Sequence, residues 1–87
     1  MAHGTAIGCV LQVTVYGPER RDFEGDVLAA LERAGFAISV EGLRRPEAGR
    51  LAISFALVAA ASPAVATRQV AEALVAAGVT EAVVGER

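Results

Sequence analysis

The sequence predicts a ferredoxin-like βαββαβ domain, an α+β two-layer sandwich in which a four-stranded antiparallel sheet carries two helices on one face. Apolar residues recur at every second position in three short segments, as in strands with one buried face, and a fourth strand is expected near the C-terminus. Two further segments have apolar residues at helical spacing, and each ends at a glycine. Both patterns repeat at an offset of 43 residues, which predicts two interleaved βαβ units.

The first unit begins with a strand over residues 9–16, which Gly17-Pro18 ends. A helix is expected within residues 19–34. Its apolar residues recur at helical spacing from Phe23 to Ala34, with Asp22 as the N-cap and Gly35 as the C-terminal stop. A second strand follows, and its inward residues are Phe36, Ile38 and Val40.

The second unit follows a polar hairpin loop that we expect over Gly42–Gly49. Its first strand has an alternating inward face of Leu51, Ile53, Phe55 and Leu57. Ser62-Pro63 then predicts a helix start and Gly78 a helix end. The fourth strand is expected over Val79–Val84.

Length and composition restrict the class of protein. The 87 residues fit one domain, and we expect a flexible segment over residues 1–8 followed by a single domain over residues 9–87. The net charge of −2 gives no general attraction to nucleic acid or anionic membranes. No apolar run reaches the length of a membrane span, and Cys9 has no cysteine partner. These features predict a cytoplasmic protein without direct membrane insertion.

The reactive side chains do not form a catalytic or metal-binding set. His3 is the only histidine, so a nucleophile–histidine pair has no secure partner. Zinc needs three or four ligands, which His3 and Cys9 do not supply, and Cys9 is expected to face the core as an inert thiol. We therefore predict no enzymatic activity, no cofactor and no metal. An active site formed between subunits is the remaining enzymatic alternative.

Arginines gather at one end of the predicted sheet. Three connections should meet there, namely Gly17–Gly25, Gly42–Arg50 and the turn at Gly78. The first two contain Arg20, Arg21, Arg44, Arg45 and Arg50. Guanidinium groups beside a helix N-terminus can hold a carboxylate or phosphate. The alternative is that these are solvated loop charges, offset by the carboxylates among them.

The sheet face away from the helices should carry small, mildly apolar residues. Its expected members are Gln12, Thr14, Tyr16, Ala37, Ser39, Glu41, Ala52, Ser54, Ala56 and Val58. A face left to water usually carries more charge, so we expect a second subunit to cover this face or an adjacent edge strand. An exposed, weakly polar sheet is the alternative. RNA-binding domains of this topology stack bases on aromatic residues of this face. Tyr16 is the only aromatic residue expected here, which argues against RNA binding.

Three segments resemble the start of an ACT domain. They are Tyr16-Gly17, Asp22-Phe23-Glu24-Gly25 and Ala34-Gly35-Phe36-Ala37-Ile38. ACT domains are regulatory domains that sense amino acids at dimer interfaces, and the resemblance implies ligand contacts near Gly17, Asp22 and Gly25. Residues 49–55 and 73–79 resemble the NIL domain of methionine-importer ATPases and the C-terminal domain of MgtC-type membrane proteins. Both of these act as regulatory tails.

The combined expectation is a non-enzymatic, homodimeric regulatory domain that senses a small carboxylate or amino acid at its dimer interface. The candidate ligand-binding residues are Gly17, Arg20, Arg21, Asp22, Gly25, Arg44 and Arg45. The alternative is a ligand-free structural or protein-interaction module, such as a soluble tail of a transporter. Neither hypothesis includes nucleic acid as a partner.

Overall fold

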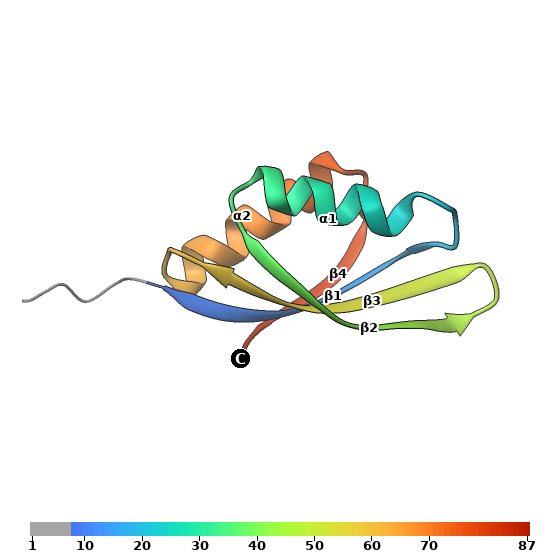
Figure 1. The fold of residues 1–87 in the computed structure, drawn as a ribbon, viewed down its shortest axis with the longest axis horizontal. Coiled ribbons are helices and arrows are strands. Elements are labelled where there is room, and N and C mark those ends of the chain that lie inside the picture. The colour runs from blue at the N-terminus through green and yellow to red at the C-terminus, as the bar shows by residue number, and fades with distance from the viewer. Residues whose placement is uncertain (1–7) are drawn as a thin grey trace, which may run out of the picture.

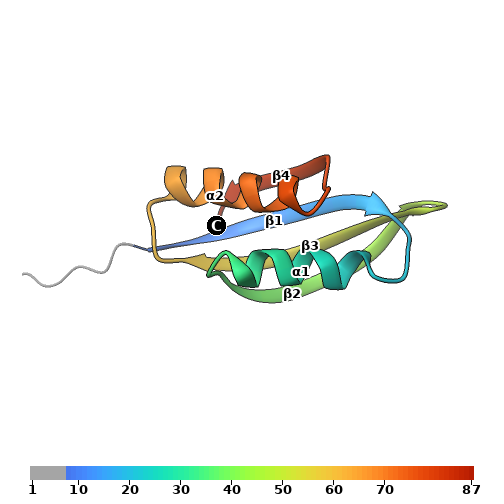
Figure 2. The same cartoon turned by 90° about the horizontal axis from the view of Figure 1, so that it is seen from above.

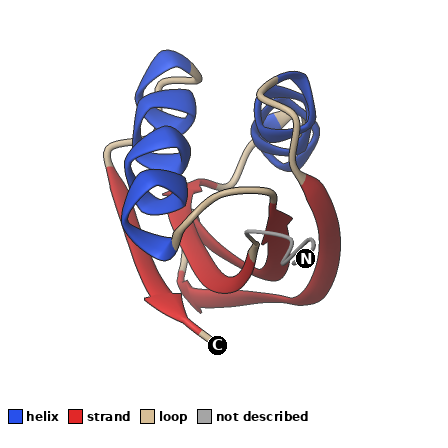
Figure 3. Cartoon of the chain, turned by 90° about the vertical axis from the view of Figure 1, so that its left-hand side faces the viewer, coloured by secondary structure: helices blue, strands red, loops and turns tan. Residues whose placement is uncertain are grey.

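The structure is a computed structural model that describes residues 8–87, which form two layers (Figure 1). The elements in chain order are β1 (Cys9–Pro18), α1 (Phe23–Arg33), β2 (Ala37–Glu47), β3 (Arg50–Ala59), α2 (Pro63–Ala76) and β4 (Glu81–Glu86). The strands form one antiparallel sheet in the order β2-β3-β1-β4, and both helices lie on the same side of it (Figure 3). The predicted ferredoxin-like βαββαβ fold is confirmed.

The inner strands β1 and β3 pair over their whole length. Their register runs from Cys9 opposite Ala59 to Pro18 opposite Arg50 without a break. Every second residue of each strand faces the helices, because strand side chains alternate between the two faces. The fully buried residues of this inner face are Leu11, Val13, Val15, Ile53, Phe55 and Leu57.

Each helix adds a narrow apolar stripe to this core. The stripe residues are Phe23, Val27 and Leu31 on α1 and Ala66, Val70 and Leu74 on α2. The helical spacing read from the sequence is therefore the spacing of the buried face. No polar or charged side chain is buried within residues 8–87, so this core is held by apolar packing alone.

The start of α2 and the ends of both helices follow their sequence signals. The Ser62 hydroxyl accepts a hydrogen bond from the Val65 amide at 3.4 Å, and Pro63 occupies the first helical position of α2. α1 and α2 are each followed by a glycine in the left-handed region, Gly35 with φ of 97° and Gly78 with φ of 85°. Both glycine stops are confirmed.

The expected polar loop over Gly42–Gly49 was wrong. Pairing of β2 with β3 continues to Glu47, so that only Ala48 and Gly49 remain as a turn. Ladder hydrogen bonds hold this polar stretch extended although no apolar alternation marks it. A bulge between Val40 and Gly42 also shifts the side-chain alternation of β2.

Because of the bulge, the open sheet face, which is the face away from the helices, carries other residues of β2 than we predicted. Gly42 pairs with Ser54 and Arg44 pairs with Ala52, so Gly42 and Arg44 lie at open-face positions, while Glu41 is the extra residue of the bulge. Arg44, which the sequence assigned to a loop, therefore takes an open-face position on β2.

The last strand begins two residues later than the expected range Val79–Val84. The Val79 amide donates a hydrogen bond of 2.9 Å to the carbonyl of Leu74 and so completes the end of α2. Val79 belongs to the helix terminus and the core, and pairing with β1 starts at Glu81 opposite Tyr16.

Within residues 8–87, no helix is long and apolar enough to span a bilayer.

The absence of a side chain at Gly17 has a packing reason, which a substitution can test. A Cβ atom at this position would lie 2.1 Å from Cζ of Phe23, and this ring is only 3% exposed and cannot move aside without leaving the core. We expect Gly17→Ala to lower the free energy of unfolding by about 1–3 kcal/mol, the usual cost of overpacking, as measured by urea denaturation.

Gly25→Ala is the matched control. A Cβ atom there would have no neighbour within 4 Å, and the residue lies in α1. Alanine should therefore raise the free energy of unfolding by about 0.5–1 kcal/mol through its higher helix propensity. A Gly17→Ala variant as stable as the parent would show that the Phe23 ring does not require a glycine there.

Candidate functional site

The three connections that the sequence predicts at one end of the sheet do meet there. The Glu19 amide donates a hydrogen bond of 2.9 Å to the carbonyl of Gly49, which joins the loop after β1 to the β2–β3 turn. Arg45 holds the Glu19 carboxylate through two hydrogen bonds, one of them 2.8 Å between Nε and Oε1. Arg50 reaches Glu81 at the start of β4. This end of the molecule is therefore tied together by polar contacts.

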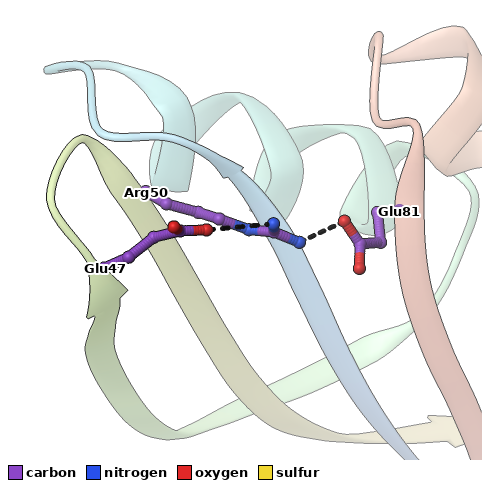
Figure 4. Close-up of polar contacts among 3 residues, drawn as sticks. All are labelled: Glu47, Arg50 and Glu81. Carbon is purple, nitrogen blue, oxygen red and sulfur yellow. Dashed lines mark hydrogen bonds and ion pairs between the residues drawn. The ribbon is translucent and has the colours of Figure 1, made fainter.

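Arg50 forms a bridge across the open face (Figure 4). Its guanidinium contacts Glu81 on one side and the Glu47 carboxylate, 3.4 Å away, on the other. The same guanidinium lies 5.1 Å from the ring centroid of Tyr16. It thus spans from β3 over β1 to β4, and the bridge covers this end of the open face.

A second bridge crosses the open face nearer the C-terminus. Arg87 Nη1 lies 2.6 Å from a carboxylate oxygen of Glu41, the bulged residue of β2. Hydrogen bonds from Arg87 and then Gln12 lower the pKa of the Glu41 carboxyl below its ordinary value. The sequence interpretation missed both bridges, because their arginines lie at strand ends rather than at alternating positions within the strands.

The bridges place charged groups on the open face. Its exposed large apolar residues are Val10, Val58 and Val83. The face carries more charge than the sequence predicted, so it needs the cover of a second subunit less than its predicted composition suggested. Cover of this face by a subunit stays a prediction.

Most of the predicted arginine cluster is already paired. Arg20 lies 3.2 Å from Asp26 and 5.7 Å from the ring centroid of Phe23, and Arg45 is held by Glu19. Within residues 8–87, Arg21 makes no ion pair, and neither does Arg44. The structural roles of Arg20 and Arg45 leave fewer free cations than the sequence suggested.

The start of α1 is an open helix terminus. Asp22 occupies the N-cap position, but its side chain makes no capping hydrogen bond, unlike that of Ser62 at α2. The first amides of the helix therefore lack a side-chain acceptor. Arg21 precedes this turn, and Gly25 within it leaves open space where a Cβ would be.

The structure divides the predicted ligand residues into three groups. Arg21, Asp22 and Gly25 lie together at the start of α1. Gly17, Arg20 and Arg45 lie at the same end, but packing or ion pairing explains them. Arg44 lies opposite Ala52, at a position on the other face of the sheet.

A groove between α1 and α2 is a further hollow in the surface. The two helices lie side by side and run in opposite directions (Figure 2), and the groove between them has a volume of about 430 Å³. Its lining residues are Asp26, Ala30, Arg33, Ala34, Ala73, Ala76 and Ala77. The sequence interpretation missed it, although the 43-residue repeat places Ala30 over Ala73 and Ala34 over Ala77.

Metal-binding side chains and the thiol of Cys9 are the other groups whose chemistry the sequence raised. Within residues 8–87, no three His, Cys, Asp or Glu side chains gather as a metal-binding group. Cys9 is partly buried and packs against the core cluster, as its predicted inward position requires. His3 and most of the segment 1–8, which was expected to be flexible, lie outside the described residues.

Comparison with known proteins relates the chain to solved structures only. No protein-family model and no curated protein sequence matches it. The regulatory subunit of aspartate kinase from Thermus thermophilus superimposes with a TM-score of 0.65 at 23% identity, over 88% of this chain and 50% of that one. An unknown protein from Galdieria sulphuraria gives 0.66 at 20% identity, over 100% and 54% of the two chains.

The C-terminal domain of MgtC from Mycobacterium tuberculosis gives a TM-score of 0.59 at 16% identity, over 99% of this chain and 94% of that domain. The resemblances to ACT-like and MgtC-type domains are thereby confirmed at the level of the fold. The resemblance to NIL domains stays a prediction. The chain spans about half the length of the first two structures and nearly all of the third.

The pairing of Glu19 with Arg45 predicts a measurable acid response. The hydrogen bond from Arg45 lowers the pKa of the Glu19 carboxyl. The lowered pKa favours folding above the ordinary pKa of glutamate, and this contribution is lost as the pH falls through the lowered value. In Arg45→Gln, NMR titration should find the Glu19 pKa moved up toward its ordinary range.

Arg44→Gln is the control for this titration, because Arg44 lies next to Arg45 in the chain and makes no ion pair within residues 8–87. The Glu19 pKa should stay low in that variant. Equal titration of Glu19 in both variants would contradict the assignment of the pairing to Arg45.

Proposed function

We propose that this chain is a non-enzymatic regulatory domain that binds a small carboxylate or amino acid at the start of α1, close to a dimer interface. The open terminus of α1 carries this proposal. Three features coincide there: a helix start without a side-chain cap, the cation Arg21 without an ion pair within residues 8–87, and sterically open space at Gly25.

The chemistry of this terminus suits an anionic group. Unpaired amides at a helix N-terminus donate hydrogen bonds outward, and the helix dipole favours negative charge there. Arg21 adds a planar donor that can bind a carboxylate through two hydrogen bonds. Glu24 and Asp26 in the same turn oppose a multiply charged anion. An amino acid, which carries an ammonium group beside its carboxylate, fits this mixture of charges better.

The comparisons support a regulatory role by likeness of fold. One matched structure is a regulatory subunit, and this chain spans half its length. A ligand-free interaction module, such as a tail domain of a larger protein, is the second candidate function, because the chain also covers almost all of the C-terminal domain of MgtC.

A thermal-shift screen of amino acids, small carboxylates and inorganic phosphate tests the proposal. A compound present at 100 times its dissociation constant adds about 2.7 kcal/mol to the free energy of unfolding, so a true ligand should raise the melting temperature by several degrees. Arg21→Ala should abolish most of that shift, because it removes the free cation beside the helix start.

Arg68→Ala is the matched control. Arg68 is an exposed arginine on α2 that also makes no ion pair within residues 8–87. It should leave the shift unchanged. An absence of any shift across the screen would favour the ligand-free interaction module, and equal loss in both variants would place the site elsewhere.

A further inference from the structure

We propose that the groove between α1 and α2 is a subunit interface, in which α1 of a second copy packs antiparallel to α1 with Asp26 of each copy facing Arg33 of the other. The inference deepens the proposed function by naming the surface through which the domain self-associates. It rests on that function only for the expectation of a dimer, and it requires no ligand.

The shape of the groove allows a helix to approach closely. Five of its seven lining residues are alanines, from both helices. The spacing between packed helices is set by the side chains at their contact, and small ones permit the lower end of about 8–10 Å. The lining of the groove is therefore mostly small and apolar, with Asp26 and Arg33 as its charged members.

The charges that line the groove favour a second copy of α1 as the partner, packed in the antiparallel direction. Asp26 and Arg33 both line the groove and lie seven positions apart on α1, so they are separated by about 10 Å along the helix axis. A twofold axis beside Ala29 and Ala30 would bring Asp26 to the partner's Arg33 and Arg33 to the partner's Asp26. The surface is therefore complementary to itself, as a twofold interface requires.

Both charged groups are available for such contacts. Arg33 makes no ion pair within residues 8–87. Asp26 bonds to Arg20 through Oδ2 alone, and its side chain is 53% exposed, so Oδ1 can accept a second guanidinium. Ala30, between the two charges on the same helix face, would lie at the crossing point.

Charge reversal tests the pairing. Asp26→Arg alone would set two guanidinium groups against each other across the interface, and Arg33→Asp alone would set two carboxylates together. Each variant should dimerise at least about tenfold more weakly than the parent in sedimentation equilibrium at low salt. An equimolar mixture of the two variants should recover the parent affinity as a heterodimer, visible by native mass spectrometry when one chain is isotope-labelled.

The mixing experiment distinguishes loss of the interface from damage to the helix that carries the substitution. Each chain in it keeps its own substitution, so recovery cannot come from repaired folding or helix-dipole interactions. Circular dichroism checks that each variant is folded. If a charge-reversal variant is unfolded, the neutral single variant at the same position, Asp26→Asn or Arg33→Gln, replaces it. Each neutral variant is also expected to weaken the dimer. Val58→Arg on the open sheet face is the control and should leave dimerisation unchanged.

Several outcomes would overturn the inference. They are a monomeric parent chain at high concentration, single variants that dimerise like the parent, no recovery in the mixture, or loss of the dimer in Val58→Arg alone. The last outcome would assign the interface to the open sheet face. A ligand-induced thermal shift in a strictly monomeric parent would overturn this interface and leave the proposed binding function standing.

Discussion

The packing of the inner strands against two narrow helix stripes is the constraint on which the rest of the structure depends. Phe55, at the centre of β3, and Val13, opposite it on β1, are both fully buried. A chain of this size buries only about 60% of the surface that its unfolded form exposes, so its margin of stability is small. Because the described core contains no buried polar group, apolar area and close packing must supply that margin.

The charged side chains work at the rim of this core. The pairs Arg45–Glu19, Arg50–Glu81 and Arg87–Glu41 each join residues that lie far apart in the sequence. Exposed ion pairs contribute little stability one by one. Their larger effect is on function, because every arginine held by a carboxylate of the same chain is less available to a ligand. Because the paired arginines are less available, the candidate site is smaller than the predicted arginine cluster and lies around Arg21.

The sequence was sufficient for the fold and insufficient for the surface. Period-two and helical spacings follow from burial, so they located both helices and the inner strands. Edge strand β2 was read too short, since its outer half over Gly42–Glu47 is held by backbone pairing and has no apolar alternation. Bridges such as Arg50–Glu81 depend on strand register, which composition does not encode locally. The groove was missed because alanine at helical spacing reads equally well as a helix former.

The internal repeat accounts for the small residues of the groove, and its departures account for the direction in which a partner helix would pack there. Equivalent alanines of the two units, Ala30 with Ala73 and Ala34 with Ala77, line opposite walls, so the walls are chemically alike. Walls of this kind accept a helix but give it no preferred direction. At an offset of 43 residues, Asp26 corresponds to Gln69, and Arg33 corresponds to Ala76. The repeat is thus broken at two groove positions by opposite charges on one helix, and only those charges can distinguish an antiparallel partner from a parallel one.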